Sequence, residues 1–253
     1  IAKKCLKLIK KIGGGVISLP CGTGKTVLAL YIASVLKLKT LVVVHKTFLQ
    51  QQWIERIKQF LGKDISIGIL RQKRTEVEGY DITVGMLQSI SMRAYDPQLF
   101  APFGLVIYDE VHRVGSKVFS RALFKAGGKY NLGLSATPYR SDGLMDLIYW
   151  HLGPLLYQKE ERKIVGVNVK IIRFQSKDSS FTLKKRYMPG KKQVPDTVKM
   201  INNLVKLPAR SSLLCKCLEV LMTAKGRKTL ILSGRRIHPK ALKEACDKLI
   251  ARK

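Results

Sequence analysis

A short glycine-rich segment, Leu19-Pro-Cys-Gly-Thr-Gly-Lys-Thr26, contains the residues that most clearly indicate chemistry. It fits the phosphate-binding pattern G-x-x-x-x-G-K-[ST], except that Leu19 stands in place of the first glycine. Its glycines permit a tight turn whose backbone N–H groups point at phosphate oxygens, and a following helix adds a favourable dipole. The lysine would reach the β- and γ-phosphates, and the threonine hydroxyl would bind Mg²⁺. The expected nucleotide-binding residues are Gly22, Thr23, Gly24, Lys25 and Thr26.

A second group, Asp109-Glu110-Val111-His112, directly follows the apolar run Gly104–Tyr108. An acid at the end of a buried strand is how nucleotide hydrolases bring a carboxylate to their metal. Asp109 is therefore expected to hold Mg²⁺ through water, and Glu110 to polarise the attacking water as general base. Taken alone, the acids could cap the next helix, and the glycine segment could be a turn without function. Together with Lys25 they predict a site that binds and hydrolyses a nucleoside triphosphate.

The segment Ser135-Ala136-Thr137-Pro138 follows another short apolar run, residues 132–134. Its hydroxyl groups would be able to connect the nucleotide site with a part of the protein that moves. By itself the segment carries little weight, because serine, threonine and proline after a strand commonly form an ordinary turn.

A basic run, LKKRYMPGKKQ at residues 183–193, lies in the second half of the chain. Lys184, Lys185 and Arg186 would contact phosphates, while the neighbouring Tyr187 would stack on a base. The same run is also typical of a nuclear-import patch or of a solvated loop. Nucleic-acid binding at this run is therefore one hypothesis of three.

Apolar runs indicate the elements that must position these residues. The spacing of Leu6, Ile9 and Ile12 predicts an amphipathic helix over residues 3–12, which three glycines end. Strands are expected at residues 16–19, 40–44, 104–108 and 132–134, and helices at 25–38, 48–61 and 118–126. Further apolar runs lie at residues 65–70 and 82–86. Strands that alternate with helices predict an α/β fold with a mostly parallel sheet, whose ligands bind beyond the carboxyl ends of the strands.

The organisation changes after about residue 155. Expected there are a strand at 167–174, a loop at 175–194, helices at 198–207 and 211–223, a strand at 229–233 and a helix at 240–251. We therefore expect a first α/β domain over residues 1–155, a connecting region over 156–227, and the start of a second α/β domain over 228–253.

The ordered set GTGKT at 22–26, DEVH at 109–112 and SAT at 135–137 resembles superfamily 2 helicases. Residues 41–49, followed by Gln52-Trp53, are similar to that family's motif Ia, and residues 81–90 are similar to its motif Ib region. GLSATPYRSDGL at 133–144 looks like the branch of XPB-like and UvsW-like DNA helicases, and is similar to helicases of poxviruses and other cytoplasmic large DNA viruses. TLILSGRRIHP at 229–239 resembles motif IV.

The resemblance implies a phosphate-loop NTPase with a RecA-like fold, followed by an incomplete second RecA-like domain. It implies ATP and Mg²⁺ as cofactors and nucleic acid as the partner, with DNA favoured over RNA. It also implies that His112, Ser135 and Thr137 couple hydrolysis to motion, and that His45 and Lys46 touch the strand backbone. The alternatives are a structural histidine at 112 and a solvated strand end at 45–46.

Two features of the resembled family fall outside residues 1–253. Its adenine-reading glutamine would precede Ile1, and its arginine-rich motif VI would follow Lys253. An arginine finger accelerates hydrolysis on the order of 10³–10⁵-fold. We therefore expect this sequence to belong to a longer protein, and the piece alone to be weakly active or inactive.

Composition narrows the class of protein further. The 47 Lys and Arg against 17 Asp and Glu give a formal net charge of +30, which favours a polyanionic partner. The longest mainly apolar run, Val27–Leu36, is interrupted by Ser34 and is much shorter than the ~20 residues of a membrane-spanning helix. Five cysteines without framework spacing favour a reducing intracellular compartment: cytoplasm or nucleus, or host cytoplasm or virion for a viral protein. The sequence is silent on oligomeric state.

Three functions remain open from sequence. The favoured one is an ATP-dependent helicase or translocase that acts on nucleic acid, with DNA favoured by analogy to the branch resembled above. The second is a nucleic-acid-stimulated ATPase that anneals strands or releases transcripts without unwinding. The third is a basic module that binds nucleic acid with little turnover, for which a steep salt dependence without ATPase activity would be the signature.

Overall fold

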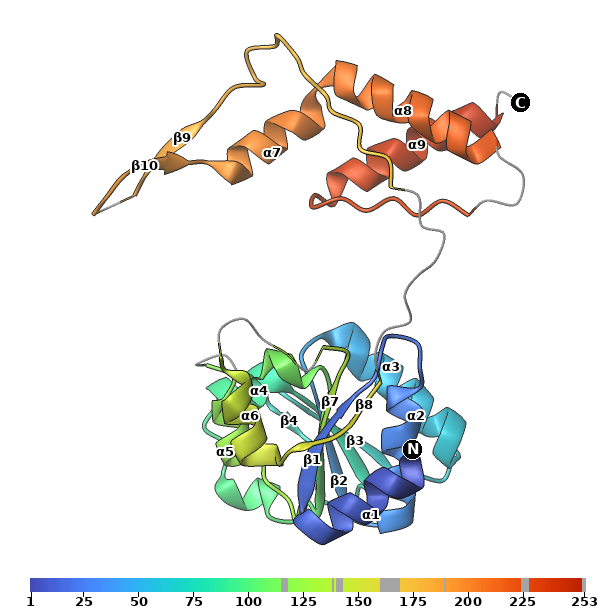
Figure 1. The fold of residues 1–253 in the computed structure, drawn as a ribbon, viewed down its shortest axis with the longest axis vertical. Coiled ribbons are helices and arrows are strands. Elements are labelled where there is room, and N and C mark those ends of the chain that lie inside the picture. Colours follow the sequence, from blue (N-terminus) through green and yellow to red (C-terminus); the bar gives the residue numbers. More distant parts are fainter. Residues whose placement is uncertain are drawn as a thin grey trace. The chain divides into compact units, whose positions relative to one another are not determined.

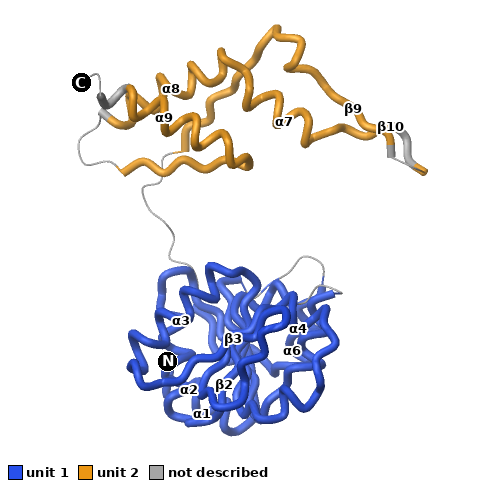
Figure 2. Tube along the Cα trace, turned by 180° about the vertical axis from the view of Figure 1, so that it is seen from behind, with its two compact units in different colours: residues 1–165 blue, residues 166–253 orange. Residues whose placement is uncertain are grey.

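The computed structural model describes residues 1–114, 118–137, 139, 143–159, 169–188, 190–223 and 228–251. Pro138, residues 140–142 of the segment 133–144, and residues 167–168 of an expected strand therefore lie outside the described part. The chain divides into two compact units, Ile1–Val165 and Gly166–Lys253 (Figure 2). The expected three-part division at residues 155 and 227 stays a prediction. Within the described ranges, no helix is long and apolar enough to cross a membrane.

Unit 1 is built around one sheet (Figure 1). Its strand order is β4-β3-β5-β2-β6-β7-β1-β8. The strands are β1 (Gly14–Ser18), β2 (Thr40–Val44), β3 (Ile67–Arg71), β4 (Arg74–Thr75), β5 (Ile82–Met86), β6 (Leu105–Tyr108), β7 (Tyr130–Ser135) and β8 (Leu155–Gln158). All neighbours run parallel except β3 and β4, which pair antiparallel at one edge. The expected α/β fold with a mostly parallel sheet is confirmed.

Helices cover both faces of this sheet (Figure 1). On one face lie α1 (Ala2–Ile12), α2 (Lys25–Leu36) and α3 (Thr47–Leu61); on the other lie α4 (Leu87–Met92), α5 (Arg121–Lys125) and α6 (Met145–Leu152). Within β2, Val42 and Val44 contribute to the first buried cluster, whereas Leu41 and Val43 contribute to the second. Because successive strand side chains point to opposite faces, a strand covered on both faces must be apolar throughout.

Unit 2 is smaller than unit 1. Its described residues form the antiparallel pair β9 (Lys185–Met188) and β10 (Lys191–Pro195), and the helices α7 (Thr197–Lys206), α8 (Pro208–Thr223) and α9 (Ile237–Ala251). Leu218 of α8 packs with Leu242 and Cys246 of α9 in a small buried cluster. The three helices match those expected from the sequence.

Three expectations for unit 2 are wrong. Residues 175–194, expected to be a loop, contain the hairpin of β9 and β10. Residues 229–233 and the described residues 169–174, expected to be strands, form none. A strand needs a neighbour that satisfies its backbone N–H and C=O groups, and an apolar run does not supply one. Leu230 and Leu232 accordingly remain 82% and 84% exposed.

Candidate nucleotide-binding and nucleic-acid-binding site

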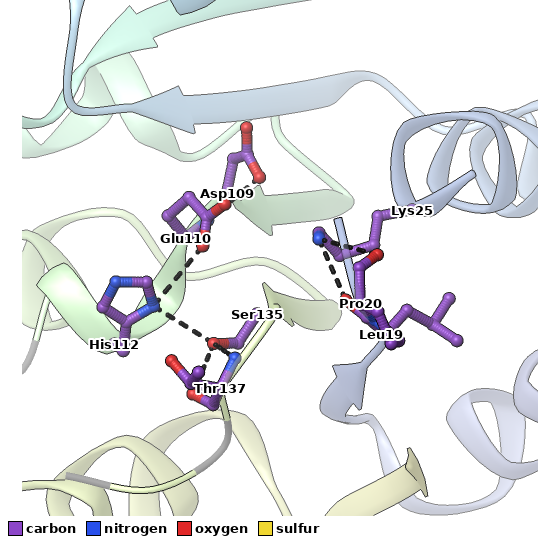
Figure 3. A network of polar contacts seen from close by, with 8 residues as sticks. All are labelled: Leu19, Pro20, Lys25, Asp109, Glu110, His112, Ser135 and Thr137. Carbon is purple, nitrogen blue, oxygen red and sulfur yellow. Dashed lines mark hydrogen bonds and ion pairs between the residues drawn. The ribbon is translucent and has the colours of Figure 1, made fainter. Parts of the chain in front are cut away.

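The sheet order brings three of the predicted segments to one edge. Strands β6, β7 and β1 are consecutive neighbours and run parallel, so their carboxyl ends lie together. The glycine segment follows β1, the acidic pair follows β6, and Ser135 ends β7. The backbone N–H of Leu19 donates to the carbonyl of Ser135 at 3.0 Å, which joins the first and third segments directly. The expected position of a ligand site beyond these strand ends thus contains all three groups (Figure 3).

The glycine segment forms a loop in which two positions have backbone conformations that only glycine adopts without strain. Gly22 and Gly24 have φ values of 75° and 89°, in the left-handed region, although a Cβ atom would meet nothing within 4 Å at either residue. The requirement is therefore conformational and not steric. Thr23 donates its hydroxyl to the Pro20 carbonyl at 2.6 Å, which closes the turn. Lys25 begins α2, whose N-terminal dipole favours an anion at this loop.

The side chain of Lys25 lies within the loop that precedes it. Its Nζ donates to the carbonyl of Leu19 at 2.9 Å and to that of Pro20 at 3.4 Å (Figure 3). Neutral carbonyls are weaker acceptors than phosphate oxygens, so this ammonium group is suited to exchange them for a phosphate. Thr26 lies half-buried at the next position of α2. This donor set fits the phosphates of a nucleotide.

Asp109 is held at both carboxylate oxygens. The indole Nε1 of Trp53 donates to Oδ2 at 2.8 Å, and the backbone N–H of Glu110 donates to Oδ1 at 2.9 Å. Burial raises the pKa of the Asp109 carboxyl, and the neighbouring Glu110 charge adds to this, whereas the hydrogen bond from Trp53 and the charge of Lys25 lower it. The charge of Lys25 therefore acts on the Asp109 carboxyl, as expected for groups at nearby strand ends.

Glu110 occupies an unusual backbone conformation for a residue with a side chain. Its φ of 48° lies in the left-handed region, one of three such non-glycine residues among those described. Such strain tends to persist where the surrounding structure fixes a functional side chain. The carboxylate Oε2 lies 3.4 Å from Nδ1 of His112, on the 3-10 helix η2 (Val111–Arg113).

His112 connects the acidic pair with the segment after β7. Its Nδ1 lies 3.1 Å from Oγ of Ser135, which is fully buried. The Ser135 hydroxyl donates to the Thr137 carbonyl at 2.6 Å and accepts from the Thr137 N–H at 3.1 Å. The sequence-predicted coupling residues therefore form one continuous network with Glu110 (Figure 3).

His45 and Lys46 lie at the carboxyl end of β2, the strand beside β6. Burial lowers the pKa of His45, and the charges of Arg113 and Lys46 lower it further. Gln88, which the sequence analysis did not single out, donates its Nε2 to the His45 carbonyl at 2.7 Å. Nδ1 of His45 and Oε1 of Gln88 are buried without a hydrogen-bond partner. This strand end therefore carries unused hydrogen-bonding capacity.

The basic residues Lys184, Lys185 and Arg186 belong to unit 2 and lie at the start of β9. Lys185 and Arg186 are exposed, and so is Tyr187, at 77% of its surface. The hairpin turn includes Gly190, whose φ of 74° again requires the left-handed region. The structure thus presents the run on a hairpin, with a charged and aromatic surface open to solvent.

Comparisons with known proteins identify the family. The family described as type III restriction enzyme, res subunit, matches residues 1–140. A protein of Acanthamoeba polyphaga mimivirus named as an ATP-dependent RNA helicase (L396) is 37% identical over 235 residues, covering 93% of this chain and 44% of that protein. The DNA 3'-5' translocase XPB2 of Sulfurisphaera tokodaii is 37% identical over 184 residues, covering 72% of this chain and 40% of the relative. The chain thus spans less than half the length of these two relatives.

Solved structures agree with the fold. The UvsW helicase from bacteriophage T4 matches with a TM-score of 0.50 and 18% identity, over 62% of this chain and 58% of that one. A hypothetical ATP-dependent RNA helicase from Sulfolobus tokodaii matches with a TM-score of 0.50 and 19% identity, over 62% and 51% of the two chains. The resemblance to superfamily 2 helicases is confirmed by the family match together with the two relatives, whereas the solved structures support the fold alone. The chain belongs to the family of the type III restriction enzyme res subunit, within the superfamily 2 helicases.

Proposed function

We propose that this chain carries the ATP-binding and ATP-hydrolysing domain of a helicase or translocase that moves on nucleic acid. The observation that carries the proposal is the shared edge of β1, β6 and β7, where the phosphate loop, the acidic pair and the Ser135 network adjoin. Charge supports the partner class, since the net charge of +30 and the exposed basic hairpin favour a polyanion.

Each side chain has a role that its contacts permit. Lys25 binds the β- and γ-phosphates in place of the two carbonyls to which it now donates. Thr26 and Asp109 would hold Mg²⁺, which when bound neutralises charge on the phosphates. Glu110 accepts a proton from the attacking water as general base. The catalytic set is then Glu110, Asp109 and Lys25.

The network of His112, Ser135 and Thr137 offers a route from chemistry to movement. Glu110 contacts His112, His112 contacts Ser135, and the Ser135 carbonyl accepts from the N–H of Leu19 in the phosphate loop. Through these contacts, a movement of Glu110 on hydrolysis of the γ-phosphate would displace the segment after β7. His45 and Lys46, at the neighbouring strand end, are proposed to bind the nucleic-acid backbone.

We propose DNA as the polymer, with RNA as the alternative. The relative from Sulfurisphaera tokodaii carries the name of a DNA translocase, and the mimivirus relative that of an RNA helicase. The test is ATP hydrolysis by the full-length protein with single- and double-stranded DNA and RNA, followed by strand displacement on the stimulating polymer. Stimulation by DNA with strand displacement supports the proposal. Stimulation without displacement indicates an ATPase that does not unwind, and no stimulation contradicts the proposal.

Ser135→Ala is expected to lower the free energy of unfolding by about 1–3 kcal/mol, because the Thr137 N–H and the His112 ring lose the buried Ser135 hydroxyl as a hydrogen-bond partner. It is also expected to reduce the stimulation of ATPase activity by nucleic acid more than the unstimulated rate. Urea unfolding and steady-state ATPase assays measure the two effects. Ser34→Ala, which removes an exposed hydroxyl on α2, is the matched control. Equal stimulation in both variants would contradict the coupling role.

Replacing Lys184, Lys185 and Arg186 together by alanine is expected to weaken binding of single-stranded DNA and flatten its salt dependence. At roughly 0.7 units of slope per phosphate contact, three lost contacts lower the slope of log K against log[salt] by about 2. Fluorescence anisotropy of a labelled oligonucleotide at several salt concentrations measures this slope. The control variant replaces Lys206, Lys216 and Lys243 by alanine. These lysines occupy exposed helix positions, so the control loses the same charge. Equal slopes in both variants would show that general charge, and not the hairpin, binds the strand.

A further inference from the structure

Trp53 is a buried residue of α3 whose polar atom points at the proposed metal carboxylate. It is 1% exposed, and its indole Nε1 donates to Oδ2 of Asp109 at 2.8 Å. The two residues are separated by 56 positions in the sequence, so the contact is created by the fold alone. A hydrogen bond from a neutral donor to a carboxylate is shorter and stronger than one between neutral groups.

The indole is a donor with a fixed position. The helix α3 follows β2 after two residues, and Gln50 of α3 donates its Nε2 to the carbonyl of Val84 in β5 at 2.8 Å. Ile57, one turn beyond Trp53, is fully buried in the same cluster. Helix α3 is thus attached to the sheet on both sides of Trp53, which leaves the indole little freedom to follow a rotating carboxylate.

The second oxygen of Asp109 is also fixed, because Oδ1 accepts the N–H of Glu110 at 2.9 Å. Two donors from separate elements define the plane of the carboxylate. Each oxygen retains a further lone pair for water or metal. Groups that orient a metal-binding carboxylate in this way influence metal affinity although they do not touch the metal.

We propose that Trp53 is a positioning residue for the Mg²⁺ site: its indole N–H holds the Asp109 carboxylate in the orientation that receives the metal. The proposal rests on the proposed function, since it assigns Trp53 to the same ATP site. The simpler alternative is a core tryptophan whose N–H needs any acceptor. That alternative predicts an effect on stability alone, whereas positioning predicts an effect on Mg²⁺ affinity.

The first test uses indole ¹H–¹⁵N NMR on the 253-residue chain, whose two tryptophans differ strongly in exposure. Trp53 is 1% and Trp150 80% exposed, and Trp150→Phe assigns the two signals. Asp109→Asn is expected to move the Trp53 signal, whereas Asp146→Asn near Trp150 leaves it in place. Saturation with Mg²⁺ and the ATP analogue AMP-PNP is expected to move the Trp53 signal, and AMP-PNP with EDTA to move it less. If the Trp53 signal does not move when Mg²⁺ is saturating, the proposal is overturned.

The second test compares Trp53→Phe with Ile57→Ala, a buried change on the same helix that retains the indole. Trp53→Phe is expected to raise the Mg²⁺ concentration at half-maximal nucleotide binding by about 10- to 100-fold. The affinity of both variants for fluorescent mant-ATP in EDTA is expected to stay within twofold of the unsubstituted chain. The Mg²⁺ midpoint of Ile57→Ala is expected to stay within twofold as well. A Trp53→Phe midpoint within twofold overturns positioning.

The combined results distinguish a failure of the positioning role of Trp53 from a failure of the proposed function. If mant-ATP binds the parent chain but the Trp53 signal and the Mg²⁺ midpoint do not respond, only the positioning role fails. If mant-ATP does not bind at all, the proposed function fails and the inference fails with it. If Trp53→Phe does not fold, the response of the Trp53 signal to Mg²⁺ and to Asp109→Asn decides between positioning and a purely structural role.

Discussion

Glu110→Gln is expected to lower kcat for ATP hydrolysis by about 10²- to 10⁴-fold, because glutamine cannot accept the proton of the attacking water. The substitution preserves shape, and the amide oxygen remains able to contact His112, which lies 3.4 Å from the carboxylate. Glutamine also gains no advantage or penalty over glutamate from the left-handed backbone at φ 48°. The effect is therefore expected in catalysis and not in folding. Phosphate release by the full-length protein at saturating ATP measures it.

The control for this variant is Glu78→Gln, at an exposed position of unit 1. It removes the same charge and is expected to leave kcat within twofold of the parent. The Kd of mant-ATP for Glu110→Gln is expected to stay close to the parent value, since Lys25 and the loop still bind the phosphates. A Glu110→Gln protein that hydrolyses ATP at the parent rate would remove this residue from the mechanism.

Lys25→Ala is expected to lower kcat/KM by about 10²- to 10³-fold or more, because the site loses its positive charge at the β- and γ-phosphates. The two carbonyls to which Lys25 donates belong to Leu19 and Pro20, in the loop itself. Truncation therefore also removes contacts that shape the loop, and weaker nucleotide binding is expected together with slower hydrolysis. Steady-state kinetics and mant-ATP titration measure the two contributions separately.

Lys58→Ala, at an exposed position of α3, is the matched control for the loss of one lysine. It is expected to change neither nucleotide binding nor kcat/KM. Similar losses in both variants would mean that net charge, and not the loop, governs ATP affinity. Unchanged kinetics in Lys25→Ala would exclude the phosphate-loop assignment.

The parts of the site that could be predicted from sequence are those defined by short local patterns. The glycine segment, the acidic pair and Ser135 each occupy a few consecutive residues after an apolar run. Parallel strands end at one edge, so the pattern also predicted that these segments adjoin. Which strands are neighbours was not predictable, because the order β6-β7-β1 depends on crossovers between distant parts of the chain.

Side-chain contacts between distant segments were beyond sequence reasoning. Neither the hydrogen bond of Trp53 to Asp109 nor that of Gln88 to the His45 carbonyl has a local signature. Trp53 belongs to a segment similar to motif Ia, but that similarity does not indicate an acidic partner for its indole. To pair Trp53 with an acid, one would have needed to know that α3 lies beside the carboxyl end of β6.

The errors in unit 2 have a different origin. The hairpin strands Lys185–Met188 and Lys191–Pro195 are basic and lack apolar alternation, so the usual sign of a strand is missing. Residues 229–233 show the opposite case, an apolar run without a strand partner among the described residues. Hydrophobic pattern indicates burial, whereas strand formation also requires a neighbouring backbone.

We propose that the edge formed by β1, β6 and β7 holds an ATPase whose turnover nucleic acid stimulates. The most direct measurement is the rate of ATP hydrolysis by the full-length protein as single-stranded DNA is titrated, with Glu110→Gln in parallel. The rate is expected to rise to saturation with DNA in the unsubstituted protein and to stay near background in Glu110→Gln. A parent rate that is independent of DNA and RNA, or a Glu110→Gln rate equal to that of the parent, would contradict it.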